Sequence, residues 1–312
     1  MAVKPRSRFA GMTITLKNSE IQLSIRPDLG GRIDQLQDLK TAHEWLWHPL
    51  DYDPQLSRKL EVGASFDGNW TGGWDEIFPN DAAGVFQNRQ LVDHGELWSP
   101  AWELLEKSEL SVKMALTCQT VPVQVEKTIA LDENQAKAKI DYLFKNQSEE
   151  TIPFLFKQHA AIAIEEGDEV LLPDCTIEPA VLEFSKIIGR QEKTRFPKAF
   201  AADGSEVNVQ RIPPRSSQLQ EFYYSSQLAV GQCGIHNQRS ASTLLMSFDI
   251  ADFPYVWVFA SFGGWQNHYV LVLEPCTNIP YDLEIACRNG TSALLPPQSS
   301  QLRTLTVELQ RL

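Results

Sequence analysis

The segment that decides the fold class is residues 121–146, VPVQVEKTIALDENQAKAKIDYLFKN. Apolar and polar residues alternate along 123–131 and again along 138–144, and a polar sequence at 132–134 separates the two runs. Successive side chains of a strand point to opposite faces, so alternation with period two is typical of a strand with one buried face. Two such runs joined by a short polar turn predict an antiparallel hairpin.

The same kind of pattern recurs towards both ends of the chain. Further alternating or apolar runs lie at 13–25, 112–116, 152–156, 244–248, 255–259, 269–274 and 302–309. No long amphipathic helix interrupts them, so we predict an all-β fold of antiparallel sheets with few short helices. Residues 189–221 are polar and contain prolines, which predicts a long surface excursion or a lid. We expect one domain over residues 12–312 and a flexible N-terminus over 1–11.

Composition narrows the classes of protein and partner. The net charge is −12 and no run of Lys and Arg interleaved with aromatic residues occurs, so nucleic acid is not an expected partner. Five scattered cysteines without a CxxC pair are typical of free thiols in a reducing compartment. Neither a secretory signal nor an apolar run long enough for a membrane span is present. We therefore expect a cytoplasmic monomer or homodimer.

The segment at 72–103, GGWDEIFPNDAAGVFQNRQLVDHGELWSPAWE, has little helical or strand periodicity although it contains three tryptophans. A Trp-rich segment of this kind predicts an ordered loop system lying against another part of the protein, and such loops often carry function. Trp beside carboxylates, an amide and an imidazole suits a carbohydrate, because the ring covers sugar C–H groups while polar side chains bind hydroxyls. The alternative is that these Trp side chains fill the core and the polar residues cap turns.

Two titratable residues at the ends of predicted strands are candidates for acid–base chemistry. In 154–159, FLFKQH, period two places His159 on the face opposite Phe154 and Phe156, towards a cleft or solvent. Glu274 ends the apolar run YVLVLE, where burial of a carboxylate is costly unless it is paired or functional. Burial would raise the pKa of Glu274 and make it a better base. The alternatives are a structural histidine and a strand-end glutamate turned to water.

A metal site has weaker support. Asp93, His94 and Glu96 are residue types that bind metals, but neither an HExxH nor an HxH pattern accompanies them. We expect no metal and no cofactor.

Taken in order, several segments resemble the aldose 1-epimerase (galactose mutarotase-like) superfamily over residues 12–309. The segments that carry the resemblance are GGRI at 30–33, GGWDEIFPN at 72–80, DHGELW at 93–98, FKQH at 156–159 and LEP at 273–275. The resemblance implies a β-supersandwich that binds a sugar on its concave face.

The resemblance also implies roles for particular residues. His159 matches the general acid of the family, Glu274 its general base, and His94 a second histidine that grips the substrate. Glu274 would take the proton of the anomeric hydroxyl while an imidazolium at His159, with a pKa near 6.5, protonates the ring oxygen. Rotation about C1–C2 and reclosure would then give the other anomer. The further substrate contacts that we predict are Trp74, Glu76, Asn80, Trp98 and Lys157.

Departures from the family pattern leave the sugar open. Asn80 is followed by Asp81 where the family typically has Arg, and Gln158 precedes His159 where it usually has Asn. The hexose-6-phosphate branch typically carries an Arg shortly after its His-Gly, whereas Glu96, Leu97 and Trp98 follow Gly95 here. We therefore predict a mutarotase for an unphosphorylated aldose. The alternatives are a non-catalytic carbohydrate-binding protein on the same fold, a hexose-6-phosphate mutarotase, and a carbohydrate hydrolase or lyase.

Overall fold

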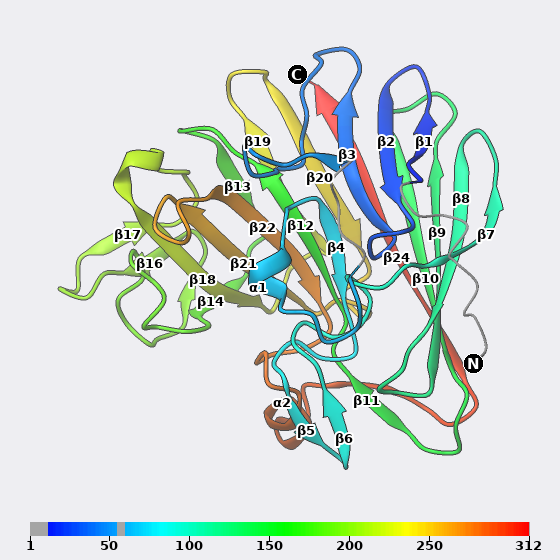
Figure 1. The fold of residues 1–312 in the computed structure, drawn as a ribbon. Coiled ribbons are helices and arrows are strands. Elements are labelled where there is room, and N and C mark those ends of the chain that lie inside the picture. Colours follow the sequence, from blue (N-terminus) through cyan, green and yellow to red (C-terminus); the bar gives the residue numbers. More distant parts are fainter. Residues whose placement is uncertain (1–11, 55–59, 312) are drawn as a thin grey trace.

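The computed structural model describes residues 12–54 and 60–311, so the predicted flexible segment 1–11 lies outside the described residues. Two large antiparallel sheets pack face to face; α1 (Phe66–Asn69) lies over the middle of one of them, and α2 (Leu283–Asn289) lies at one end (Figure 1). Strands account for 48% of the chain and helices for 5%, which confirms the prediction of an all-β fold.

The first sheet has ten strands and carries the candidate site. In spatial order its strands are β1 (Ile14–Lys17), β2 (Ile21–Arg26), β3 (Arg32–Asp38), β4 (Trp74–Ile77), β12 (Lys157–Ala163), β22 (Tyr269–Cys276), β21 (Tyr255–Phe262), β18 (Leu219–Ser226), β14 (Thr176–Pro179) and β15 (Thr194–Arg195). Strands from distant parts of the chain are therefore neighbours at its centre, where β12 lies between β4 and β22.

The second sheet has eight strands and contains the hairpin predicted from residues 121–146. Its order is β13 (Glu169–Leu171), β19 (Gln232–Asn237), β20 (Ser242–Phe248), β24 (Ser300–Arg311), β10 (Lys137–Asn146), β9 (Val123–Leu131), β8 (Ser111–Thr117) and β7 (Glu103–Lys107). The antiparallel register of β9 and β10 pairs Ala138 with Leu131 and Phe144 with Val125, as the alternation predicts.

Smaller elements lie around the two sheets. They are the pairs β11 (Ile152–Phe154) with β23 (Ala293–Leu295), β16 (Lys198–Phe200) with β17 (Glu206–Asn208) and β5 (Gly84–Phe86) with β6 (Arg89–Leu91), and the helices α1 (Phe66–Asn69), α2 (Leu283–Asn289) and η2 (Arg215–Ser217). The excursion predicted at 189–221 contains the β16–β17 hairpin, which projects beside β14 and β18 (Figure 1).

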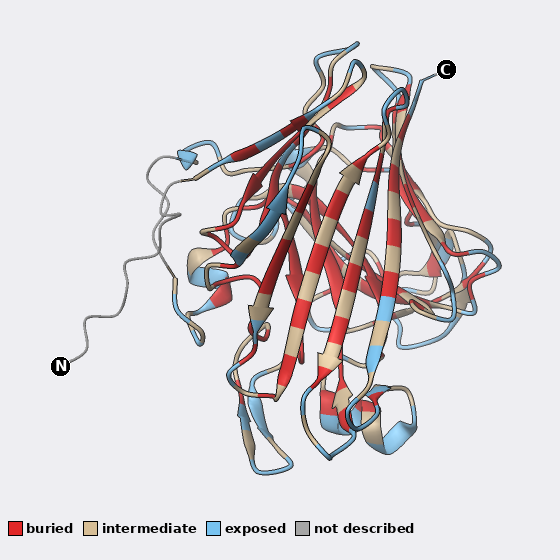
Figure 2. Ribbon diagram, turned by 90° about the vertical axis from the view of Figure 1, so that its right-hand side faces the viewer, coloured by how far each residue is buried: buried red, intermediate tan, exposed pale blue. Residues whose placement is uncertain are grey.

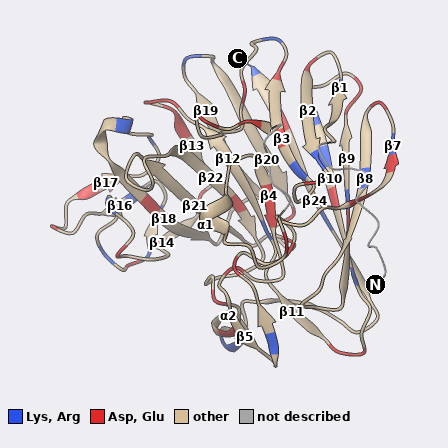
Figure 3. Ribbon diagram, viewed as in Figure 1, with Lys and Arg blue, Asp and Glu red and all other residues tan. Residues whose placement is uncertain are grey.

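The alternation of side chains gives the ten-stranded sheet two apolar faces. On β22, Leu271 and Leu273 belong to the main core between the sheets, whereas Val270 and Val272 belong to a second apolar cluster on the opposite face. Bands of buried and less buried residues along the long strands follow the same alternation (Figure 2). Charged residues are scattered over strands and loops (Figure 3). The candidate site lies on the second face.

The glycines at 30 and 31 lie where two backbones approach closely. Both take positive φ angles, and a Cβ on Gly30 would lie 2.1 Å from the backbone oxygen of Trp98. No side chain fits at that distance, so glycine is required. This contact brings the loop that contains Trp98 against the turn between β2 and β3.

Candidate active site

A cavity of about 340 Å³ lies over the second face of the ten-stranded sheet. Its polar lining residues are Asp67, Asp81, His94, Lys157, His159, Glu274 and Tyr281, and its apolar ones are Phe66, Trp70, Val181, Phe184, Phe222, Phe259 and Trp265. The volume falls in the range of about 300–1,000 Å³ that is usual for small-molecule sites. The structure therefore brings four of the sequence-predicted residues together: His94, Lys157, His159 and Glu274.

The pairing of β12 with β22 sets His159 and Glu274 opposite each other. The register pairs Ala160 with Leu273 and Lys157 with Cys276, and counting along both strands places His159 across from Glu274. Directly opposed residues on one face have Cβ atoms about 4.5–5.5 Å apart. An imidazole and a carboxylate thus face one cavity from neighbouring strands.

Lys157 forms a buried charge bridge beside this pair. Its Nζ lies 2.6 Å from Asp81 Oδ2 and 2.5 Å from Glu274 Oε2, and it sits 4.3 Å from the centre of the Trp257 ring. Burial lowers the pKa of Lys157, but the charges of Asp81 and Glu274 outweigh it and raise that pKa above its ordinary value. Lys157 is therefore a cation at neutral pH, and its ammonium group forms ion pairs with both carboxylates.

The Glu274 carboxyl is 1% exposed, and its burial raises its pKa above the ordinary value although Lys157 opposes the shift. This direction agrees with the prediction from the apolar strand in which Glu274 lies. A carboxylate with a raised pKa is a stronger general base than an exposed one.

His159 differs from its prediction. Its ring meets Phe66 and Trp70 edge to face, with centroid distances of 5.1 and 5.4 Å, and its Nδ1 is buried and has no hydrogen-bond partner among the described residues. Burial lowers the pKa of His159 well below 6.5, and the positive charge of Lys157 lowers it further. The expectation of an imidazolium with a pKa near 6.5 was wrong: the ring is neutral at pH 7, because an aromatic cage and an ammonium group surround it.

His94 enters the pocket from the loop after β6. Its ring stacks on Phe66 with centroids 3.9 Å apart, and its Nδ1 lies 2.8 Å from Asp93 Oδ1. The φ angle of His94 is +54°, which non-glycine residues rarely adopt, and strained backbone of this kind is found at functional sites. The ring centroids of His94 and His159 are 6.3 Å apart. The two imidazoles therefore line the same cavity, one from a loop and one from β12.

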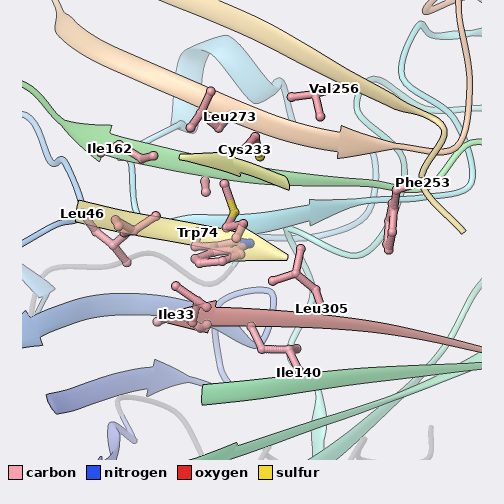
Figure 4. Packing of buried hydrophobic residues seen from close by; sticks show 14 of the residues in the cluster. Ile33, Leu46, Trp74, Ile140, Ile162, Cys233, Phe253, Val256, Leu273 and Leu305 are labelled. Carbon is pink, nitrogen blue, oxygen red and sulfur yellow. The ribbon is translucent and has the colours of Figure 1, made fainter. Parts of the chain in front are cut away.

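Trp74 and Glu76 lie on the other side of β4, away from the pocket. Trp74 is in the main core between the sheets, as Figure 4 shows, and its Nε1 donates to Gln158 Oε1 at 2.9 Å. Glu76 is fully buried and forms an ion pair with Lys127. Residues 74 and 76 are two apart in a strand, so both side chains point to the same face, here the core. Neither is therefore a substrate contact.

Asn80 and Trp98 are buried behind the pocket wall. Asn80 Nδ2 donates to the backbone oxygens of Ala82 and Val92, which fixes the loop that presents Asp81. The Trp98 ring lies edge to face with Phe66 at 4.9 Å. Neither residue lines the cavity, so we assign both to support of the loop and not to ligand contact.

Sequence reasoning missed Asp81 and the aromatic residues that line the cavity. One signal was present in 255–259, YVWVF, where aromatic residues alternate with valines. The valines belong to the main core and Trp257 to the second apolar cluster, with Phe259 packed against it. Alternation between two kinds of apolar residue indicates a strand covered on both faces.

Substitution of His159 by asparagine is expected to change how stability depends on pH. The unfolded chain protonates this histidine as pH falls below about 6.5, whereas the folded protein does not, since its pKa is lowered. Below pH 6.5 the free energy of unfolding of the wild type should therefore fall, relative to that of His159→Asn, by up to about 1.4 kcal/mol per pH unit. Above pH 6.5 the difference between the two proteins should not depend on pH. Urea unfolding of both proteins from pH 7.5 to 5 measures the difference, and parallel curves would contradict the lowered pKa.

No protein-family model and no curated protein matches the sequence. Among solved structures, the Slr1438 protein from Synechocystis sp. PCC 6803 is similar with a TM-score of 0.72 and 14% identity, covering 100% of this chain and 99% of that chain. A galactose mutarotase related enzyme from Lactobacillus acidophilus has a TM-score of 0.65 and 13% identity, covering 96% and 97%. A galactose mutarotase-like protein from Lactobacillus casei has a TM-score of 0.65 and 15% identity, covering 96% and 100%. The chain therefore has the galactose mutarotase-like fold, as the resemblance predicted.

Two further observations concern metals and membranes. Within residues 12–54 and 60–311, no group of three or more His, Cys, Asp and Glu side chains is arranged to hold a metal ion. None of the described helices has the length and apolar character needed to cross a membrane.

Proposed function

We propose that this protein interconverts the α and β anomers of an unphosphorylated aldose by general acid–base ring opening. The observation that carries the proposal is the opposition of His159 and Glu274 on adjacent strands at the base of one cavity. The galactose mutarotase-like fold, which the chain shares with the solved structures above, also supports the proposal.

In the proposed reaction the reactive form of the protein is the fraction in which His159 carries a proton and Glu274 is ionised. Glu274 accepts the proton of the anomeric hydroxyl while the His159 imidazolium donates a proton to the ring oxygen. The C1–O5 bond breaks, the aldehyde forms, and rotation about C1–C2 exposes the other face of C1. Ring closure returns both protons with the roles of the two residues reversed. His94 would hold a hydroxyl group of the sugar.

The opposite pKa shifts of the pair favour transfer of a proton from His159 to Glu274 through the sugar. Burial raises the pKa of Glu274 and lowers that of His159. The first shift makes the Glu274 carboxylate a stronger base, and the second makes the His159 imidazolium a stronger acid.

The charges of the pocket favour an unphosphorylated substrate over a hexose 6-phosphate. Among the described residues that line the cavity, Lys157 is the only Lys or Arg, and its ammonium is bound to Asp81 and Glu274. A phosphate dianion is usually recognised by unengaged Arg or Lys groups. The neighbouring carboxylates would repel it.

The proposal is tested by the rate of anomer interconversion over a panel of freshly dissolved aldoses. Polarimetry or ¹H NMR in dilute buffer follows each α anomer with and without protein, and glucose 6-phosphate is included. Acceleration of at least one free aldose supports the proposal. Binding without acceleration of any sugar supports the non-catalytic alternative, and acceleration of the phosphate ester alone supports the phosphorylated one.

Substitution of Lys157 by methionine is expected to move the pH profile of kcat/KM to higher pH. The ammonium group lowers the pKa of Glu274 by favouring the carboxylate, and lowers that of His159 by disfavouring the imidazolium. Its removal raises both values, so both limbs of the profile shift in the same direction. Lys157→Arg keeps the charge and serves as the control. An unshifted profile in Lys157→Met, with an unchanged circular dichroism spectrum, would contradict this role.

A further inference from the structure

The cavity divides into a reactive side and an aromatic side. β21 and β18 continue the floor beyond β22 and present Phe259 and Phe222. Phe184 and Trp265 pack on Phe259, with ring centroids 5.3 and 5.4 Å away. Trp70 lies 6.0 Å from Trp265 and 5.4 Å from His159, so it joins these rings to the reactive side. These aromatic rings form a connected wall, which we call the aromatic wall.

Hydrogen-bonding groups are gathered on the reactive side. Lys157 contacts both Asp81 and Glu274, Glu274 opposes His159, and the His94 ring lies 6.3 Å from that of His159. The two remaining polar lining residues, Asp67 and Tyr281, are exposed, so they lie towards solvent. The aromatic wall itself offers no oxygen and, among its described members, only indole N–H groups.

This division decides which sugars fit. If C1 and the ring oxygen meet Glu274 and His159, the part of the ring remote from them faces the aromatic wall. A hydroxyl group pressed against aromatic carbon loses its water without gaining a partner, which is unfavourable. A C–H or methyl group at the same place gains apolar contact instead.

We propose that the substrate class is a deoxy aldose, lacking a hydroxyl group at C3, C4 or C6. This inference rests on the proposed function, because mutarotation is what places C1 at Glu274. The aromatic wall selects for the missing hydroxyl, while the reactive side binds the hydroxyl groups that remain near C1.

A set of matched sugars tests the selection. The rates of D-glucose and of its 2-, 3-, 4- and 6-deoxy analogues are each divided by their uncatalysed rates. Apolar pockets discriminate against an added hydroxyl group by up to about 10²-fold, so we expect at least one of the 3-, 4- and 6-deoxy sugars to exceed glucose in kcat/KM by about 10–100-fold. The 2-deoxy analogue is the control: its missing hydroxyl adjoins C1, on the reactive side, and it should show no gain. If glucose equals or exceeds all three, the inference is overturned.

A binding measurement separates this inference from the proposed function. Saturation-transfer NMR with irradiation of the aromatic protons of the protein reports which sugar protons lie on the aromatic wall, whether or not turnover occurs. We expect strong transfer at the protons of C3, C4 or C6, besides transfer to H1 from the rings that lie around His159. Phe184→Gln, which places an amide in the aromatic wall from a loop, should reduce the preference for the deoxy sugar severalfold. Transfer that is confined to H1 and H2 would overturn the inference even if the enzyme is active.

Discussion

Replacement of Glu274 by glutamine is expected to lower kcat/KM for anomer interconversion by about 10²–10⁴-fold, the usual contribution of one general base. Glutamine has nearly the same shape but its amide does not accept a proton at neutral pH. Because the raised pKa of Glu274 comes first from burial, no exposed carboxylate of the protein is an equivalent base. Initial rates of polarimetric change, with the uncatalysed rate subtracted, measure the loss.

Glu221 offers a matched control on the same sheet. It is also a buried glutamate with a pKa raised by burial, to about 7, but its Oε1 accepts from the backbone N–H groups of Lys186 and Ile188. It does not line the cavity. Glu221→Gln should retain most of the activity. If Glu274→Gln remains as active as Glu221→Gln, Glu274 is not the base and the assignment of the pair fails.

The alternation of residues was sufficient to predict the sheets and the side of the strand on which His159 lies. In 154–159, Phe154 and Phe156 enter the main core, and Lys157 and His159 line the cavity, as period two requires. Successive side chains of a strand point to opposite faces, so the face of each residue follows from that of its neighbours in the sequence.

The charge bridge around Lys157 could not be predicted in the same way. Lys157 and Glu274 are far apart in the chain and meet only because β12 pairs with β22 in one register. Asp81 reaches the same ammonium from a loop held by Asn80. The lowered pKa of His159 comes first from burial and then from the charge of Lys157, two residues away on the same face of β12. The sequence places Lys157 near the histidine, but the burial depends on residues from other parts of the chain.

The segment GGWDEIFPN predicts Glu76 as a substrate contact, but the position of Glu76 on β4 gives it a structural role in the core. Period two gives Trp74 and Glu76 one face and Asp75 and Ile77 the other. The sequence does not state which face is the core until β4 is set beside β12, where His159 pairs with Asp75. Glu76 then faces the second sheet, where it forms an ion pair with Lys127 of β9.

Replacement of Lys127 by methionine is therefore expected to lower the free energy of unfolding by about 3–5 kcal/mol at pH 7, the usual cost of leaving one buried charge without its partner. Lys127 and Glu76 are both fully buried, and Lys127 Nζ also donates to the backbone oxygen of Gly31 at 3.1 Å. Tyr142 OH donates to Glu76 Oε1 at 2.7 Å but carries no charge to replace the ammonium. The shift of the urea midpoint measures the loss.

The pH dependence and a double variant separate the loss of the ion pair from the loss of packing. Burial raises the pKa of Glu76, and removal of Lys127 raises it further. Since the folded variant then binds a proton more readily than the unfolded chain, its deficit should shrink as pH falls from 7 to 5. Lys127→Met with Glu76→Gln removes both charges and should recover most of the stability. A deficit that is independent of pH and remains in the double variant would mean that packing, not charge, holds the sheets together here. Tyr142 OH also lies 2.9 Å from Oε1 of Gln158, the residue between Lys157 and His159 on β12. Loss of the ion pair should therefore loosen the strand that presents both residues to the cavity.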